Sequence, residues 1–246
     1  MTTTQRDTTP VAAATFDVVN PGTTAVVGTY PIHTAEDIAQ RLEQARDAQV
    51  WWAAQGFAGR KRIMTSWVRW LAAHAEEIYA LGNAETARPI GDVQMEFIAG
   101  LEDIRWTAAH AERVLKRRKV APGIAFTNFA ADVVHEPLGV VGIITPWNVP
   151  IYTVLSGAAC ALAAGNTVIV KPSELSAGAG AFVVEGFYKA NPGVPVGVIS
   201  YVHGLGETGA ALCTSGVDKL AFTGSVPTGR RVMAACAEKL TPVVLE

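Results

Sequence analysis

The sequence predicts an α/β fold: a doubly wound parallel sheet of about five strands, with a helical N-terminal segment and a small β arm. Beyond residue 137, short apolar runs alternate with longer segments of helical periodicity, a pattern typical of strand–helix–strand units with right-handed crossovers. The apolar runs lack polar alternation, as expected for strands covered on both faces. Residues 34–115 repeat apolar side chains at helical spacing, which predicts helices before the sheet begins.

The N-terminal half divides into three expected parts. Residues 1–15 are polar and are expected to be a disordered tail, and residues 16–123 are expected to form the helical N-terminal part of the main domain. Thr34-x-x-Asp37 is typical of a helix cap. The basic run at 116–119 is either an anion site or the solvated end of a helix, and a position at a helix C-terminus favours the latter. Residues 124–136 are extended and rich in turns, which predicts a hairpin apart from the main body.

Residues 137–246 are expected to form the α/β core. The expected strands cover 140–144, 167–171, 197–202, 219–223 and 242–245, and the expected helices cover 153–164, 176–190, 207–215 and 226–240. In such sheets ligands bind beyond the carboxyl ends of the strands, so the residues that follow each strand are the candidates for a site.

Composition argues against several classes of partner. The net charge of −2 gives no electrostatic reason for binding nucleic acid or an anionic membrane. The longest apolar stretch, 153–170, contains two glycines and an asparagine and does not favour a membrane span. The start of the chain has no secretory pattern. Three distant cysteines, Cys160, Cys213 and Cys236, favour neither disulfides nor zinc. A cytoplasmic protein is expected, with the cysteines as packing residues.

Polar residues follow three of the predicted strands, and each has two interpretations. Lys171 and Glu174 in "KPSE" form either a surface ion pair or a clamp on the two hydroxyls of a ribose. Gly224 and Ser225 open a helix and form either a phosphate site or a plain helix cap. Asn148 in "PWN" is either a turn residue or a donor to an oxyanion.

A literal dinucleotide fingerprint is also present, Gly204-x-Gly206-x-x-Gly209. That fingerprint needs an acidic residue at the end of the following strand to hold a ribose. The following strand instead ends at Phe222-Thr223-Gly224. We therefore interpret the glycines as a flexible turn beside the site.

Taken together, the motifs resemble the aldehyde dehydrogenase superfamily. They are "PLGVVGIITPWNVP", "AAGNTVIVKPSE", "KLAFTGSVPTG" and the final "LE", and the resemblance runs from Phe16 to Glu246. It implies a Rossmann-like nicotinamide-binding domain, a catalytic domain and a small oligomerisation arm, to which residues 124–136 would belong. It also implies a small aldehyde as substrate and a homo-oligomer for the complete enzyme.

The resemblance carries residue roles onto this sequence. Asn148 would help to form the oxyanion hole and Glu246 would be the general base. The residues implied in cofactor binding are Ile144, Pro146 and Trp147 along the groove, Lys171 and Glu174 at the adenosine ribose, and Gly224 and Ser225 at the pyrophosphate. A carboxylate at Glu174 would repel a ribose phosphate, so NAD is expected rather than NADP.

Two departures shape the expected function. The family motif around the base reads Glu-Leu-Gly-Gly, and this sequence finishes on its glutamate, Glu246; the nucleophilic cysteine, in its Gly-Gln-x-Cys context, is absent. The expectation is an NAD-dependent oxidation of an aldehyde to an acid through a thioester on a cysteine outside this chain, with the catalytic domain absent and the chain inactive alone. The alternative is a non-catalytic dinucleotide-binding fragment or one half of a split enzyme. Transfer of the thioester to coenzyme A is a third reading, against which Glu246 argues because it favours hydrolysis.

Overall fold

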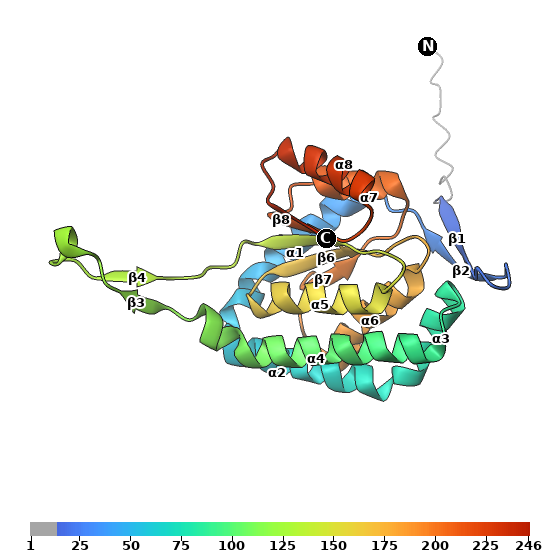
Figure 1. The fold of residues 1–246 in the computed structure, drawn as a ribbon, viewed down its shortest axis with the longest axis horizontal. Coiled ribbons are helices and arrows are strands. Elements are labelled where there is room, and N and C mark those ends of the chain that lie inside the picture. Colours follow the sequence, from blue (N-terminus) through green and yellow to red (C-terminus); the bar gives the residue numbers. More distant parts are fainter. Residues whose placement is uncertain (1–13) are drawn as a thin grey trace, which may run out of the picture.

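A computed structural model describes residues 14–246, in which five parallel strands form the central sheet (Figure 1). Their spatial order is β7-β6-β5-β8-β9, and every pairing is parallel. The bounds are β5 Val140–Ile144, β6 Thr167–Lys171, β7 Ile199–Tyr201, β8 Lys219–Phe222 and β9 Val243–Leu245. The predicted fold class is therefore confirmed, and the first two strands match the predicted ranges to the residue.

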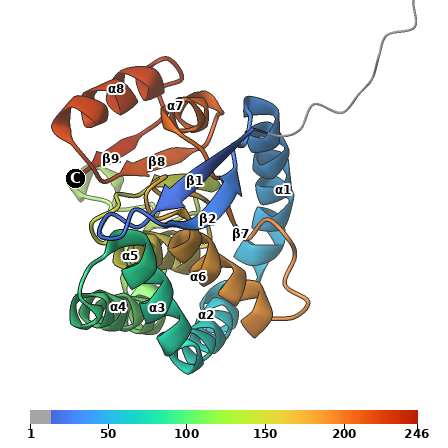
Figure 2. The same ribbon diagram turned by 90° about the vertical axis from the view of Figure 1, so that its right-hand side faces the viewer.

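Helices cover both faces of the sheet, which gives the layered arrangement visible in Figures 1 and 2. One face carries α5 (Pro150–Ala163) and α6 (Ala177–Ala190), backed by α2 (Gly56–Ala73), α3 (Ala75–Thr86) and α4 (Ile90–Leu115). The other face carries α1 (Ala35–Ala54), α7 (Gly206–Thr214) and α8 (Val226–Ala237). Each face has its own cluster of buried apolar side chains. Double coverage explains why the strands are apolar at every position.

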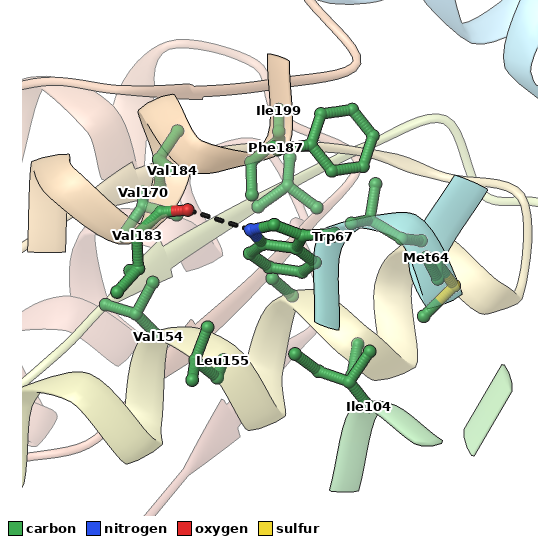
Figure 3. Close-up of a cluster of buried hydrophobic side chains, with 14 of the residues drawn as sticks. Met64, Trp67, Ile104, Val154, Leu155, Val170, Val183, Val184, Phe187 and Ile199 are labelled. Carbon is green, nitrogen blue, oxygen red and sulfur yellow. Dashed lines mark hydrogen bonds between the residues drawn. The ribbon is translucent and has the colours of Figure 1, made fainter. Parts of the chain in front are cut away.

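Buried tryptophans join the N-terminal helices to the sheet layer. The indole N–H of Trp67 donates to the Val183 carbonyl at 2.9 Å, and its ring meets Phe187 edge-on at 5.5 Å (Figure 3). Trp52 donates in the same way to the Leu162 carbonyl at 2.9 Å. Both side chains are fully buried, so each satisfies its one polar atom inside the core. Both tryptophans belong to the segment 34–115, in which apolar side chains repeat at helical spacing.

A buried carboxylate ties α3 to the start of α6. Glu85 is 2% exposed and accepts hydrogen bonds from the amides of Gly178 and Ala179 at 2.7 and 2.9 Å. Burial raises the pKa of Glu85, against the lowering effect of these two bonds. The first amides of a helix have no partner within it, so Glu85 fixes the beginning of α6, which follows directly on the "KPSE" segment.

The N-terminal part contains a hairpin that the sequence did not predict. Strands β1 (Thr15–Val19) and β2 (Val26–Pro31) pair antiparallel, so Thr15 already belongs to a strand, while residues 1–13 of the expected tail lie outside the described residues. The turn is held by Asn20, whose side chain accepts from the amides of Gly22 and Thr23 at 2.9 Å each. The capping box of Thr34 and Asp37 that opens α1 is confirmed.

The arm begins earlier than expected. Helix α4 ends at Leu115, and β3 (Arg118–Val120) pairs antiparallel with β4 (Ala131–Val133) around a short 3-10 helix at Ile124–Phe126. The two strands project from the body (Figure 1). The run 116–119 is exposed and begins at the helix end, as predicted, since Lys116 is the C-cap of α4; the structure differs in that Arg118 and Lys119 lie in a strand, and Arg117 pairs with Asp132 at 2.6 Å. Cross-strand pairing replaces the helix here.

Candidate cofactor site

The order in which strands are added to the sheet reverses between β5 and β8. A pocket lies at the carboxyl ends of the strands at this point. After β5 the chain adds β6 and β7 on one side and then returns to place β8 and β9 on the other. Such a switch point is where an open parallel sheet binds ligands. The pocket has a volume of about 560 Å³. All seven residues predicted to bind a cofactor line it: Ile144, Pro146, Trp147, Lys171, Glu174, Gly224 and Ser225.

Lys171 and Glu174 meet where β6 ends. The Lys171 ammonium lies 3.7 Å from the Glu174 carboxylate and donates to the Pro172 carbonyl at 3.2 Å. Lys171 is buried (4% exposed), whereas Glu174 reaches the surface. Burial lowers the pKa of Lys171, and the charge of Glu174 opposes that shift. The pair presents an ammonium donor and a carboxylate acceptor to the same pocket, the two groups that a vicinal diol can bind.

Gly224 and Ser225 form the tight turn from β8 into α8. Ser225 is the N-cap, and its hydroxyl accepts from the Thr228 amide at 3.5 Å. A Cβ atom added to Gly224 would lie 2.6 Å from the Phe222 ring, so the turn has no room for a side chain. Ser225 is therefore a cap, and the positive end of α8 still faces the pocket. The two interpretations of this segment do not exclude one another.

The glycine-rich turn before α7 also borders the pocket. Gly206 and Gly209 line it with Ala210, and Gly204 has a φ of +147° that favours glycine. Small residues on α7 thus face Thr228 and Arg231 of α8 across a slot. From the sequence we predicted no role for Arg231 or Ala210. No local sequence pattern marks them, because the packing of α7 and α8 decides which helix faces turn toward the pocket.

Asn148 and Glu246 lie outside the lining of this pocket. Asn148 is exposed, two residues before α5 begins. Glu246 lines an adjoining pocket of about 340 Å³, and Thr145, Phe222 and Thr223 border both pockets. The Glu246 carbonyl accepts from the Gly224 amide at 3.0 Å, and the Glu246 amide donates to Phe222 at 3.0 Å. The predicted base is therefore joined through its backbone to the predicted pyrophosphate turn.

A larger pocket, of about 680 Å³, lies elsewhere. It is lined by residues near the amino ends of the strands, such as Leu138, Asn166 and Lys219, and by the base of the arm at His135. In sheets of this type ligands bind at the opposite ends of the strands. Topology therefore favours the pocket of about 560 Å³ as the candidate cofactor site.

The three cysteines do not form a nucleophilic centre. Cys213 and Cys236 are buried, as packing residues are expected to be, but Cys160 is exposed and that interpretation is wrong for it. Although Cys160 is exposed as a residue, its thiol is partly desolvated, and desolvation raises the pKa of each thiol, to about 12 for Cys213. A thiol with a raised pKa supplies little thiolate. Within residues 14–246, no three or more His, Cys, Asp or Glu side chains converge as metal ligands, and no helix is long and apolar enough to cross a membrane.

Comparison with known proteins gives a consistent picture. Residues 9–246 match a sequence model described as "Aldehyde dehydrogenase family". The chain is 35% identical to aminoaldehyde dehydrogenase 2 of Zea mays and 36% identical to betaine aldehyde dehydrogenase 1 of Oryza sativa subsp. japonica, in each case over 96% of this chain and 48% of the relative. It therefore spans about half the length of these curated relatives.

Solved structures agree in fold. The NAD+ complex of an aldehyde dehydrogenase from Bacillus cereus superposes with a TM-score of 0.87 at 31% identity, over 95% of this chain and 47% of that one. An NAD-dependent aldehyde dehydrogenase from Sinorhizobium meliloti gives 0.88 at 32% identity, over 95% and 46%.

Proposed function

Because the chain belongs to the aldehyde dehydrogenase family, we propose that it is the cofactor-binding part of an enzyme that oxidises an aldehyde to a carboxylic acid with NAD. The observation that carries this proposal is the convergence of seven strand-end residues on one pocket at the switch point. The pocket fits a dinucleotide: Lys171 and Glu174 would hold a ribose, and the turn at Gly224 and Ser225 would meet the pyrophosphate. When bound, the nicotinamide would accept the hydride.

Two further residues are proposed to serve the reacting group. Asn148 would donate its side-chain amide to the oxygen of the aldehyde as negative charge develops on it. Glu246 would accept a proton from the water that attacks the thioester. The backbone bonds that join Glu246 to Phe222 and Gly224 support this role, because they place the base beside the cofactor pocket.

The direct test is isothermal titration of the 246-residue chain with NAD+. We expect saturable binding at one site per chain. Titration without heat of binding, confirmed by an unchanged melting temperature in millimolar NAD+, would refute a cofactor role.

The thioester step needs a reactive cysteine, and we propose that this chain does not supply it. The support is the raised pKa of Cys160, Cys213 and Cys236. The chain with NAD+ and a simple aldehyde such as propanal is then expected to give no NADH absorbance. The same observation supports a second candidate function, a non-catalytic dinucleotide-binding fragment or half of a split enzyme. Steady formation of NADH by the chain would rule out this second candidate.

Glu174 is proposed to set the preference for NAD over NADP. Its carboxylate faces the pocket beside Lys171, and a phosphate on the ribose would bring like charges together, which disfavours binding. Replacing Glu174 with Ala is expected to narrow the ratio of the NADP+ and NAD+ dissociation constants about tenfold, close to 1.4 kcal/mol. Glu207→Ala, an exposed carboxylate at the start of α7 outside the pocket, is the control. An unchanged ratio in Glu174→Ala would contradict this role.

Assembly and cellular location are each proposed from one feature of the chain. The arm carries exposed apolar side chains, with Ile124 at 96% and Phe129 at 62% exposure, a surface suited to burial between copies of the complete enzyme. A cytoplasmic location is proposed from the free cysteines, although two relatives are named peroxisomal and chloroplastic. Sedimentation of the complete enzyme and cell fractionation test these two points.

A further inference from the structure

The segment that follows β2 is joined to the turn before α7 through His33. The His33 amide donates to the His203 carbonyl at 2.9 Å, and the His203 amide donates to Nδ1 of the His33 ring at 2.9 Å. The Thr208 hydroxyl, in the first turn of α7, donates to the His33 carbonyl at 3.0 Å. These three bonds, which we call the His33 latch, hold the chain on both sides of the glycine-rich turn at residues 204–206.

Helix α7 connects the latch to the cofactor pocket. Gly206, Gly209 and Ala210 line that pocket, whereas Thr208 is buried outside its lining and bonds to His33. A Cβ atom added to Gly209 would lie 3.6 Å from Cδ of Lys171, which is an ordinary contact distance. The N-terminal part of α7 therefore lies directly against the side chain that is proposed to hold the ribose.

The beginning of α7 has no cap of its own. Its N-cap is Leu205, which makes no side-chain hydrogen bond to the first turn. Leu205 also lies between Gly204 and Gly206, and glycine restricts the backbone less than any other residue. A side-chain cap usually fixes the first turn of a helix. The restraint that such a cap would supply comes here from the His33 latch.

The protonation state of His33 decides how many acceptors its ring offers. Nδ1 faces the His203 amide, and Nε2 lies 2.8 Å from the Arg41 guanidinium, which can only donate. A neutral imidazole has one acceptor nitrogen, and an imidazolium has none. Protonation of His33 therefore leaves both donors facing N–H groups and places a second positive charge beside Arg41. Both effects weaken the latch.

We propose that His33 is a positioning residue for the cofactor pocket: its neutral ring holds α7 against Lys171, and protonation of the ring weakens NAD+ binding. The inference rests on the proposed cofactor role and adds a means of regulating it by pH. His33 lies outside the lining of the cofactor pocket, so it acts through α7 and not by contact with the dinucleotide.

Titratable groups from several elements lie around the His33 ring. They are Asp37 and Arg41 of α1, Tyr30 of β2, Glu185 of α6, Tyr201 of β7 and the following His203, with Glu85 of α3 behind Tyr30. Burial and then the charge of Arg41 lower the pKa of His33, while its hydrogen bond with His203 and the charge of Asp37 act in the opposite direction. The pKa of His203 is about 4. Above pH 5, a proton taken up by these two rings therefore goes to His33.

The test is isothermal titration of the 246-residue chain with NAD+ at pH 7.5 and 5.5. His33→Leu removes the acceptor, and its dissociation constant at pH 7.5 should be about tenfold above that of the wild type. His33→Asn keeps an oxygen on Cγ, where the ring carries Nδ1, but does not titrate, so its dissociation constant at pH 7.5 should stay within about twofold. Between pH 7.5 and 5.5 the dissociation constant should rise at least about threefold more in the wild type than in His33→Asn. His135→Asn, at an exposed site on the arm, is the control and should keep the pH dependence of the wild type.

The outcomes separate this inference from the proposed function. Circular dichroism at each pH shows which variants are folded, and if His33→Leu does not fold, the comparison of the wild type with His33→Asn decides. A purely structural role of His33 would lower the melting temperature of the variants without changing the pH dependence of binding. Equal pH dependence in the wild type and His33→Asn, or an unchanged affinity in folded His33→Leu, would overturn the inference and leave the cofactor role standing. Absence of NAD+ binding by the wild type at both pH values would refute the proposed function, and this inference with it.

Discussion

Replacing Lys171 with Met is expected to weaken NAD+ binding about 10- to 100-fold. A hydrogen bond to a charged group contributes roughly 1.5–3 kcal/mol, and each 1.4 kcal/mol corresponds to about tenfold in the dissociation constant. The Lys171 ammonium is well placed for such a bond, because the Pro172 carbonyl and Glu174 hold it at the end of β6 inside the pocket. Isothermal titration of the variant with NAD+ measures the effect.

The substitution is suited to the purpose because it preserves the bulk of the side chain. Removing a buried ammonium also removes its desolvation cost, so the variant should fold. Lys219→Met is the matched control: Lys219 begins β8, far along the strand from the cofactor pocket, and lines only the larger pocket at the amino ends. A dissociation constant for Lys171→Met within twofold of the wild type would mean that the ribose is held elsewhere.

How far the sequence predicted this fold depended on burial. β5 and β6 lie in the middle of the sheet, are buried almost throughout and were predicted to the residue, because a strand covered on both faces must be apolar at each position. β1 is largely exposed, with Val18 as its one buried residue, and β3 consists of Arg118, Lys119 and Val120. Such strands are defined by pairing with a distant segment, and no local pattern marks them.

The same distinction holds for the candidate site. Residues at or just beyond the end of a strand, such as Lys171 and Gly224, were predictable because parallel topology brings strand ends together. Arg231 and Ala210 lie on helices, and which of their faces turns toward the cofactor pocket is decided by packing against neighbouring elements. Helix rotation is a tertiary property, so the slot between α7 and α8 emerged only from the structure.

Stability should fall as the pH drops from about 6.5 to about 4, because of His203. Its side chain is 3% exposed after β7, and its backbone amide donates to the His33 ring at 2.9 Å. The rings of Tyr30 and Tyr201 lie 4.9 and 4.8 Å away. Burial, followed by the positive charges of His33, Lys171 and Arg41, lowers the pKa of His203 to about 4.

The direction and size of the effect follow from proton linkage. Unfolded His203 has its ordinary pKa near 6.5, so between about pH 4 and 6.5 the unfolded chain binds the proton more strongly than the folded chain does. Protonation therefore favours unfolding, and His203 alone is expected to remove about 3 kcal/mol across that window. Urea unfolding at constant ionic strength between pH 4.5 and 7 measures the decline, and His203→Gln should flatten it. His135→Gln, at an exposed site on the arm, should leave the decline in place. If stability declines as steeply in His203→Gln as in the wild type, other groups cause the decline. The His203 ring of the folded wild type would then already be protonated or be reached by water.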